Sequence, residues 1–393
     1  MIKPKSISIF GSTGSIGKQA LEVVRAFPKQ FNLVSLSANK NITLLAAQLK
    51  EFNPQYVCIG EPSLISELES VIQSLGLKTK VVSGQSGYID ICNIPHDLIV
   101  MSIVGTAGLM PTVTAIKQKI PIALACKEVL VAAGPQVTYL ANQYNVPIIP
   151  IDSEHAALKQ CLSSVNEDIS QVRKLILTAS GGPFLELDKQ KFETITPQTA
   201  LKHPNWNMGG KISIDSATMM NKGLELIEAH FLFDIPYDKL DIIIHPQSII
   251  HSLVEFSDGT MLSQLGLPDM RLPIQYAMTY PEKWNAPWPR TTLSDLPNLT
   301  FIKPDFLKFP LPQIAIDCGK KSQSYPVVMN AANEAAVNLF LDHQIKFNDI
   351  VKIIESTLST FNHYTPTTIE EIILIDKETK EKVYESIYSG RIT

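Results

Sequence analysis

The segment Ser6-Ile-Ser-Ile-Phe-Gly-Ser-Thr-Gly-Ser-Ile-Gly17 decides the fold of this chain of 393 residues. Its apolar start, Ser6–Phe10, predicts a strand, and apolar residues from Ile16 to Phe27 recur at helical spacing. A strand, a glycine turn and a helix in this order are the setting of a dinucleotide-binding fingerprint, in which glycines let the backbone approach a pyrophosphate. We therefore predict a nucleotide site here, with a plain tight turn as the alternative.

The second predicted strand, Phe31–Ser37, favours NADPH over NADH as the nucleotide. An NAD site usually carries an acid near the end of this strand, where it binds the ribose 2′-hydroxyl. Here the strand leads into Ser37-Ala-Asn-Lys-Asn41, which contains no acid. Lys40, with Ser37 and Asn39, suits a 2′-phosphate. The alternative is a solvated lysine in a loop.

Further buried strands continue an α/β pattern, and polar residues follow two of them. The predicted parallel strands are Gln55–Ile59, Asp97–Met101, Pro121–Ala125 and Val146–Ile151. Cys126-Lys-Glu128 stands directly after one of them. Side chains just past the carboxyl end of a parallel strand face the ligand crevice, although Lys127 and Glu128 would suit a helix N-terminus equally well.

Asp152-Ser-Glu-His155 follows the last of these strands. If the backbone stays extended, Asp152 and Glu154 point to the same side. Two carboxylates suit a hard divalent cation such as Mg²⁺ or Mn²⁺. The alternative is that Asp152 or Ser153 caps a following helix. We interpret His155 as structural.

The stretch Ser213–Phe233 predicts an anion site, because its second part has the pattern of a helix. Ser216, Asn221 and Lys222 are good phosphate ligands, and a helix start adds backbone N–H groups. Lys222 and Glu225 are three residues apart and share a helix face. That face suits a phosphate at one end and a metal ion at the other, with an ordinary surface Lys–Glu pair as the alternative.

Between these motifs, residues 181–210 form a long polar stretch that we predict to be a lid. It contains His203-Pro-Asn-Trp206 and ends in Gly209-Gly210, so that a Trp stands at the tip and glycines at the exit. The alternative is a surface insertion with Trp206 packed locally. In the strands that follow, we interpret His245 and His251 as structural.

Length and composition predict a folded chain of several domains, with 45% hydrophobic and 18% charged residues. We predict the α/β class. The expected parts are an N-terminal Rossmann-like NADPH-binding domain at 1–150, a central α+β catalytic domain at 151–280, a proline-rich linker at 281–312 and a C-terminal helical domain at 313–393.

The composition also argues against several kinds of partner. A net charge of −4 without basic tracts argues against nucleic acid, and the longest apolar runs are too short for a membrane span. Five scattered cysteines indicate reduced thiols, without structural zinc or disulfides. Because the first strand begins near Ser6, we expect no signal or transit peptide and a location in a bacterial cytoplasm.

Taken together, the motifs resemble one family over essentially the whole chain: 1-deoxy-D-xylulose 5-phosphate reductoisomerase. The matching motifs are Gly11–Gly17, Cys126–Glu128, Asp152–His155, Ser180-Gly-Gly-Pro-Phe184, His203–Trp206, Ser213–Glu225 and Ile244–His251. The resemblance implies a homodimer that depends on NADPH and on one Mg²⁺ or Mn²⁺ per active site. Its reaction would be the isomerisation and reduction of 1-deoxy-D-xylulose 5-phosphate to 2-C-methyl-D-erythritol 4-phosphate, in the non-mevalonate isoprenoid pathway.

The resemblance also implies roles for individual residues. The metal ligands would be Asp152, Glu154 and Glu225, of which the two glutamates also contact substrate. Phosphate would be held by Ser180, His203, Ser216, Asn221 and Lys222. The substrate backbone would contact Lys127 and Ser153, with Trp206 as cover and with Lys127 and Glu154 as the catalytic proton-handling groups. NADPH would be lined by Thr13, Gly14, Ser15, Ile16, Asn39, Lys40, Asn41, Cys126, Glu128 and Gly209.

Three positions depart from the family pattern: Cys126 stands where we expect Asn, Asn39 where we expect Gly, and Ala179 where we expect Gly. None is a predicted metal or phosphate ligand. The competing hypotheses are an NADP-dependent dehydrogenase similar to homoserine dehydrogenase, and a non-catalytic NADPH sensor. Three acids beside a phosphate-binding helix argue against the first, and the presence of all those acids and of Lys222 argues against the second.

Overall fold

The computed structural model describes residues 3–206 and 208–389, and the chain divides into two compact units. The first unit comprises Met1–Val129, Val137–Ala156 and Asp269–Pro289. The second unit comprises Leu130–Gln136, Ala157–Pro268 and Arg290–Thr393. No helix within the described ranges has both the length and the apolar character that a membrane crossing requires.

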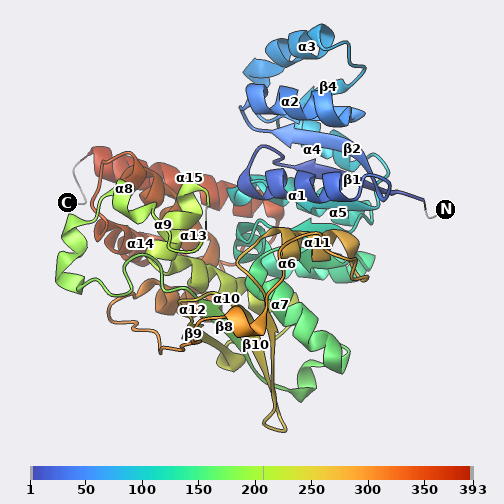
Figure 1. The fold of residues 1–393 in the computed structure, drawn as a ribbon. Coiled ribbons are helices and arrows are strands. Elements are labelled where there is room, and N and C mark those ends of the chain that lie inside the picture. The colour runs from blue at the N-terminus through green and yellow to red at the C-terminus, as the bar shows by residue number, and fades with distance from the viewer. Residues whose placement is uncertain (1–2, 207, 390–393) are drawn as a thin grey trace. The chain divides into compact units, whose positions relative to one another are not determined.

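The first unit is built on a seven-stranded parallel sheet with the strand order β4-β3-β2-β1-β5-β6-β7 (Figure 1). Its strands are β1 (Lys5–Phe10), β2 (Phe31–Ala38), β3 (Tyr56–Ile59), β4 (Lys80–Ser83), β5 (Leu98–Met101), β6 (Ile122–Leu124) and β7 (Ile148–Pro150). The order reverses between β1 and β5, and ligands bind at such a switch point in doubly wound sheets. The predicted α/β class is confirmed, whereas β4 had not been predicted.

Helices cover this sheet, and one of them comes from a distant part of the sequence. The helices are α1 (Ser15–Ala26), α2 (Ile42–Phe52), α3 (Ile65–Ser74), α4 (Gly84–Cys92), α5 (Leu109–Lys117), most of α6 (Glu128–Tyr144), the first residues of α7 (Ser153–Leu162) and α11 (Arg271–Thr279). In α11, Ile274 is fully buried and belongs to the same hydrophobic cluster as Ile7 and Ile9 of β1. Arg271 contacts Glu22 of α1 and lies over the ring of Trp288. The predicted domain boundaries did not anticipate this return of the chain to the first unit.

The turn after β1 requires glycine at two positions. Gly11 has φ +86°, and a Cβ atom on it would lie 2.5 Å from the carbonyl oxygen of Ser102. A Cβ atom on Gly17 would lie 2.2 Å from the carbonyl oxygen of Gly11. Both distances are too short for any side chain, so the glycines let α1 begin directly beneath the turn.

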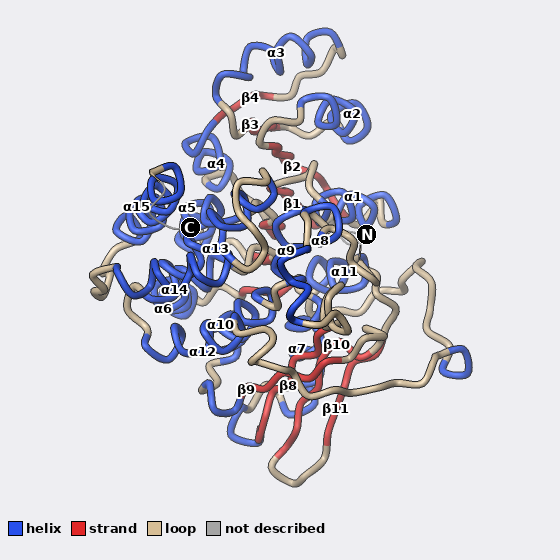
Figure 2. Tube along the Cα trace, turned by 90° about the vertical axis from the view of Figure 1, so that its left-hand side faces the viewer, coloured by secondary structure: helices blue, strands red, loops and turns tan. Residues whose placement is uncertain are grey.

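The second unit contains a four-stranded sheet with the order β11-β10-β8-β9, whose strands lie side by side in Figure 2. The strands are β8 (Val172–Ala179), β9 (Leu240–Ile244), β10 (Ile250–Phe256) and β11 (Met261–Leu265). The β8–β9 pair is parallel, and β10 is antiparallel to both of its neighbours. The accompanying helices are the rest of α7, α8 (Pro197–Ala200), α9 (Gly210–Ala217), α10 (Met220–Phe233), α12 (Leu311–Lys321), α13 (Tyr325–Leu341), α14 (Asp349–Thr360) and α15 (Ile369–Tyr388).

The C-terminal helices and this sheet share one hydrophobic core. Leu177 of β8, Leu224 of α10, Val337 of α13 and Ile353 of α14 belong to a single buried cluster. The predicted helical C-terminal region is confirmed. Its description as a separate domain that begins at residue 313 stays a prediction.

The N-terminus of α15 provides a test of local stability. Thr368 Oγ1 accepts a hydrogen bond from Glu371 N at 3.1 Å, and the Glu371 side chain accepts one from Thr368 N, which completes a capping box. We expect Thr368→Ala to lower the free energy of unfolding by about 1 kcal/mol, because the Glu371 N–H group loses its acceptor. Urea denaturation measures this change. Thr368→Ser keeps the acceptor, so an equal loss in that variant would contradict the capping argument.

Candidate active site

In the first unit, a buried ion pair joins the ends of two neighbouring strands. Lys127 follows β6 and Asp152 follows β7, and these strands pair in parallel, so their carboxyl ends meet at one edge of the sheet. The Lys127 Nζ atom lies 2.6 Å from Asp152 Oδ2, and the two side chains are only 6% and 14% exposed. A charge this deeply buried requires a partner, so each side chain fixes the other.

The backbone does not stay extended after Asp152, so the predicted alternation of Asp152 and Glu154 is wrong. Helix α7 begins at Ser153, and Ala156 N donates to Asp152 O at 2.8 Å. Glu154 therefore lies in the first helical turn, where a carboxylate interacts favourably with the helix dipole. Ser153 Oγ donates to Glu154 Oε2 at 2.5 Å and orients that carboxylate.

Cys126, at the position where the resemblance leads us to expect Asn, faces the loop after β5. Its thiol donates to Gly105 O at 2.9 Å and lies 3.4 Å from Glu128 Oε2. Cys126 and Glu128 are both buried. Glu128 occupies the first turn of α6, which fits the helix-start alternative for this motif.

Seven of the residues predicted to bind NADPH, Thr13–Ile16 and Asn39–Asn41, follow the carboxyl ends of β1 and β2, which are neighbours in the sheet. Gly14 is exposed at the start of α1, and Asn39, Lys40 and Asn41 are exposed in the turn after β2. Ser37 is fully buried instead. Its Oγ accepts from Gly11 N at 2.8 Å, so Ser37 holds the glycine turn, and the expectation that it faces a 2′-phosphate is wrong.

In the second unit, two helices meet at the predicted phosphate site. Ser216 lies near the end of α9, and Asn221 and Lys222 lie in the first turn of α10. The two helices are joined through Met219, which has φ +64°. A Cβ atom on Gly182 would lie 2.6 Å from Ser216 O, so the glycine loop after β8 packs directly against this corner.

Glu225 is held by both of its predicted phosphate-binding neighbours. Lys222 Nζ lies 2.5 Å from Glu225 Oε2, and these side chains are 5% and 1% exposed. Asn221 Nδ2 donates to Glu225 Oε1. The alternative of an ordinary surface Lys–Glu pair is therefore wrong, because the pair is buried.

His203 joins this group as a neutral imidazole. Its Nδ1 atom accepts from Asn205 N at 3.2 Å and from Trp206 N at 3.0 Å, so Nε2 carries the proton and donates to Ser180 Oγ at 3.1 Å. Burial, with a smaller contribution from the positive charge of Lys222, lowers the pKa of His203 to about 4. Ser180 Oγ also accepts from Gly182 N at 3.2 Å, so its own hydroxyl proton points away from these two donors.

The stretch predicted as a lid is partly a packed element. Phe184 and Phe192 are buried, and their rings contact the ring of Phe347. Trp206 is half-buried, and its ring centroid lies 6.2 Å from that of His251. Gly209 is exposed at the N-terminus of α9. Residue 207 lies outside the described residues, and motion of this stretch stays a prediction.

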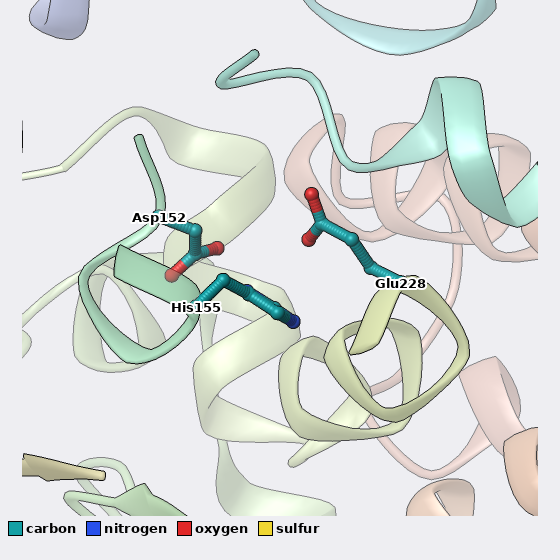
Figure 3. Close-up of side chains that lie close together, drawn as sticks. All are labelled: Asp152, His155 and Glu228. Carbon is teal, nitrogen blue, oxygen red and sulfur yellow. The ribbon is translucent and has the colours of Figure 1, made fainter. Parts of the chain in front are cut away.

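Two further buried residues have metal-ligand chemistry that the sequence interpretation passed over. The His155 side chain projects from the first turn of α7, shortly after Asp152, and the Glu228 side chain projects from α10 (Figure 3). Both are fully buried. The signal for Glu228 was its spacing, because it stands three residues after Glu225 on the same helix face.

The burial of His251 predicts a loss of stability in acid. Burial lowers the pKa of His251 to about 4, although hydrogen bonds with the backbone of Leu267 and Gly266 favour protonation. The unfolded chain therefore binds more protons below a pH of about 6.5, so this stability is present above that pH and is lost as the pH falls towards 4. The slope from one such histidine approaches about 1.4 kcal/mol per pH unit.

Urea denaturation at several values of pH between 7 and 4 measures this effect. We expect a flatter pH profile for His251→Gln than for the wild type. The exposed His343 provides the control, because His343→Gln should keep the wild-type slope. The same slope in His251→Gln and in the wild type would contradict the prediction.

Three family models match successive parts of this chain. Residues 7–134 match the family model 1-deoxy-D-xylulose 5-phosphate reductoisomerase. Residues 148–233 match the model of the 1-deoxy-D-xylulose 5-phosphate reductoisomerase C-terminal domain. Residues 265–382 match the model of the DXP reductoisomerase C-terminal domain.

Named relatives match this chain over nearly its full length. The 1-deoxy-D-xylulose 5-phosphate reductoisomerase of Desulforamulus reducens is 47% identical over 384 residues, which cover 98% of this chain and 99% of the relative. That of Chloroherpeton thalassium is 47% identical over 382 residues, which cover 97% and 98%.

Solved structures show the same similarity. The reductoisomerase from Zymomonas mobilis in complex with NADPH has a TM-score of 0.90 and 39% identity, with 98% of this chain and 99% of that chain covered. A DOX-P reductoisomerase in complex with NADPH, fosmidomycin and magnesium has a TM-score of 0.93 and 37% identity, with 98% of each chain covered.

Proposed function

Since the chain belongs to the 1-deoxy-D-xylulose 5-phosphate reductoisomerase family, we propose that it converts 1-deoxy-D-xylulose 5-phosphate to 2-C-methyl-D-erythritol 4-phosphate with NADPH and a divalent metal ion. The observation that carries this proposal is the near-complete match to named reductoisomerases at 47% identity. Relatives in complex with NADPH and with magnesium support the two cofactors. The reaction belongs to the non-mevalonate isoprenoid pathway.

Asp152, Glu154 and Glu225 are the proposed metal ligands. Three carboxylates fit Mg²⁺ or Mn²⁺, because both are hard cations that prefer oxygen donors. When bound, the ion supplies Lewis-acid stabilisation of negative charge on the substrate oxygens. The hydrogen bonds of Ser153 to Glu154 and of Asn221 to Glu225 orient the carboxylates in advance.

Lys127 and Glu154 are the proposed catalytic residues that hold and move protons. The Lys127 ammonium is fixed by Asp152 within a buried environment, which restricts the directions in which it can donate. Ser153 and Lys127 would contact the carbon backbone of the substrate. Trp206 would cover the substrate and exclude water from the enolate formed during the rearrangement.

The substrate phosphate is assigned to Ser180, His203, Ser216, Asn221 and Lys222. Lys222 provides the positive charge. The N–H groups of Met220 and Lys222 at the start of α10 already donate to Thr218 Oγ1 and Met219 O, so the proposed phosphate ligands are side chains. Ser180 would donate its hydroxyl proton to the phosphate, because Gly182 N and His203 Nε2 use both acceptor positions of its oxygen. Because Lys222 and Glu225 are one helical turn apart, a phosphate at one and the reacting oxygens at the other fix a five-carbon chain between them.

NADPH is assigned to the loops that follow β1 and β2, and it supplies hydride to the aldehyde produced by the rearrangement. The positive charge of Lys40 favours the 2′-phosphate. The full proposed set is Thr13, Gly14, Ser15, Ile16, Asn39, Lys40, Asn41, Cys126, Glu128 and Gly209. At Cys126 the thiol donates to Gly105 O, so this side chain shapes the neighbouring loop.

We also propose a homodimer that forms through β11, acting in the cytoplasm of a bacterium. Strand β11 is an edge of its sheet, and its Met261, Leu262 and Leu265 side chains are 50%, 41% and 37% exposed. At the opposite edge, Ile302 pairs with Ile244 of β9 and protects it. An uncovered edge with apolar side chains favours pairing with a second chain.

Charge at this edge should disrupt the dimer. We expect Leu262→Lys to shift the wild-type dimer to a monomer in size-exclusion chromatography with light scattering, since the interface would have to bury a charge. Leu293 is 75% exposed in another segment, so Leu293→Lys is the matched control and should stay dimeric. A dimeric Leu262→Lys variant would contradict the proposed interface.

Removal of one metal ligand tests the proposed reaction. We expect Glu225→Gln to lower kcat at least about a hundredfold, because transition-state charge stabilisation is lost. The measurement is NADPH oxidation at 340 nm with 1-deoxy-D-xylulose 5-phosphate and Mn²⁺. Glu193→Gln changes an exposed carboxylate and should keep wild-type activity.

The wild type itself separates the competing functions in this assay. Activity that EDTA abolishes supports a metal-dependent reductoisomerase. Activity that EDTA leaves intact would favour a plain dehydrogenase. Absence of turnover, with NADPH still bound, would favour a sensor.

A further inference from the structure

A buried glutamine in α2 makes a two-point contact with the glycine turn after β1. The Gln48 side chain is 4% exposed. Its Nε2 atom donates to Ser12 O at 2.9 Å, and its Oε1 atom accepts from Ser12 Oγ at 2.7 Å. The nitrogen and the oxygen of the carboxamide therefore both bond to Ser12.

The same turn is held from the opposite direction by the end of β2. Ser12 N donates to Ser37 O at 2.7 Å, and Gly11 N donates to Ser37 Oγ at 2.8 Å. Ser12 and Ser37 are both fully buried. The turn is therefore fixed on one side by β2 and on the other by the middle of α2.

Helix α2 also begins at the second loop assigned to the cofactor. The helix starts after Asn41, whose Oδ1 atom accepts from Leu44 N at 3.0 Å and caps the helix. Gln48 stands seven residues after Asn41, which is about two helical turns. Because a helix transmits position rigidly over two turns, the place where Gln48 contacts the turn also determines where Lys40 stands.

We propose that Gln48 is a positioning residue for NADPH, which sets the loop assigned to the pyrophosphate at a fixed distance from the turn assigned to the 2′-phosphate. This inference rests on the proposed function. Gln48 acts through Ser12 and Asn41 and is buried away from the cofactor itself. Its neighbours Leu45 and Leu49 in α2 are fully buried, so an apolar side chain would satisfy packing at this position. A buried carboxamide is tolerated only when its hydrogen bonds are made, and here they are made to the turn.

A second buried hydrogen bond in the same sheet provides a matched control. Ser35 of β2 donates to Ser8 Oγ of β1 at 2.7 Å, and both side chains are fully buried. Neither residue belongs to the glycine turn or to the turn that carries Lys40. Loss of this contact should lower stability without moving either loop.

The test compares Gln48→Met with Ser35→Ala in the full-length protein. For Gln48→Met we expect the Kd of NADPH, measured by fluorescence titration, and its KM to rise about tenfold or more, because the buried Ser12 O loses its donor and Ser12 Oγ keeps only its bond to Ser37 O. We expect kcat at saturating NADPH and the KM of the sugar phosphate to change less than about threefold. Ser35→Ala should lower the Tm and keep the wild-type Kd.

A fragment of the cofactor distinguishes two effects of Gln48→Met. One is a change in the relative placement of the two loops, and the other is damage to a single loop. Adenosine 2′,5′-bisphosphate reaches the Lys40 turn only, so Gln48→Met should bind it within about twofold of the wild type, since alignment matters only for a ligand that spans both loops. Ser12→Ala removes one of the two hydrogen bonds and should give an intermediate rise in the Kd of NADPH, even if Gln48→Met folds poorly.

Two outcomes would overturn the positioning role. The first is a wild-type Kd of NADPH in both Gln48→Met and Ser12→Ala. The second is an equal loss of affinity for NADPH and for the fragment. A wild-type protein that fails to bind NADPH at all would instead overturn the proposed function, so the two failures are distinguishable.

Discussion

A buried charge must be paired, and the arrangement of the proposed active-site residues follows from that constraint. Lys127 pairs with Asp152 in the first unit, and Lys222 pairs with Glu225 in the second. Removal of one partner would leave the other charge uncompensated in an apolar interior, which is far more costly than the net gain from forming the pair. Each lysine therefore holds one carboxylate in place, at the end of a strand or near the start of a helix. This is the condition under which carboxylates can hold a cation.

The elements with strong local signals were predicted from the sequence. The strand, glycine turn and helix from Ser6 onward were correct, because apolar periodicity and glycine spacing are local properties. Strand β4 was missed because Lys80–Ser83 is short and only partly buried, without clear alternation. The extended conformation expected at Glu154 was wrong because helix α7 begins one residue earlier, and the short segment from Asp152 onward fits either conformation.

The chemistry of individual site residues was less accessible from the sequence, because it depends on contacts across the fold. Ser37 has the residue type of a phosphate ligand, yet its hydroxyl is used by Gly11 N, a residue 26 positions earlier in the chain. His203 is neutral because it is buried and stands near Lys222. A sequence motif shows neither the burial nor this neighbour. The residues that carry the family motifs could be named in advance, whereas their protonation states and hydrogen-bond partners could not.

The return of Asp269–Pro289 to the first unit has a consequence for how the protein is made. Helix α11 contributes the fully buried Ile274 to a core that is otherwise built from the beginning of the chain. During synthesis, the ribosome must therefore release the strands of the second sheet before the first unit can complete its own core. Neither unit is one continuous stretch of sequence, so neither can be excised by a single cut at each end. The two units are expected to mature together as a nascent chain, although each has a core of its own.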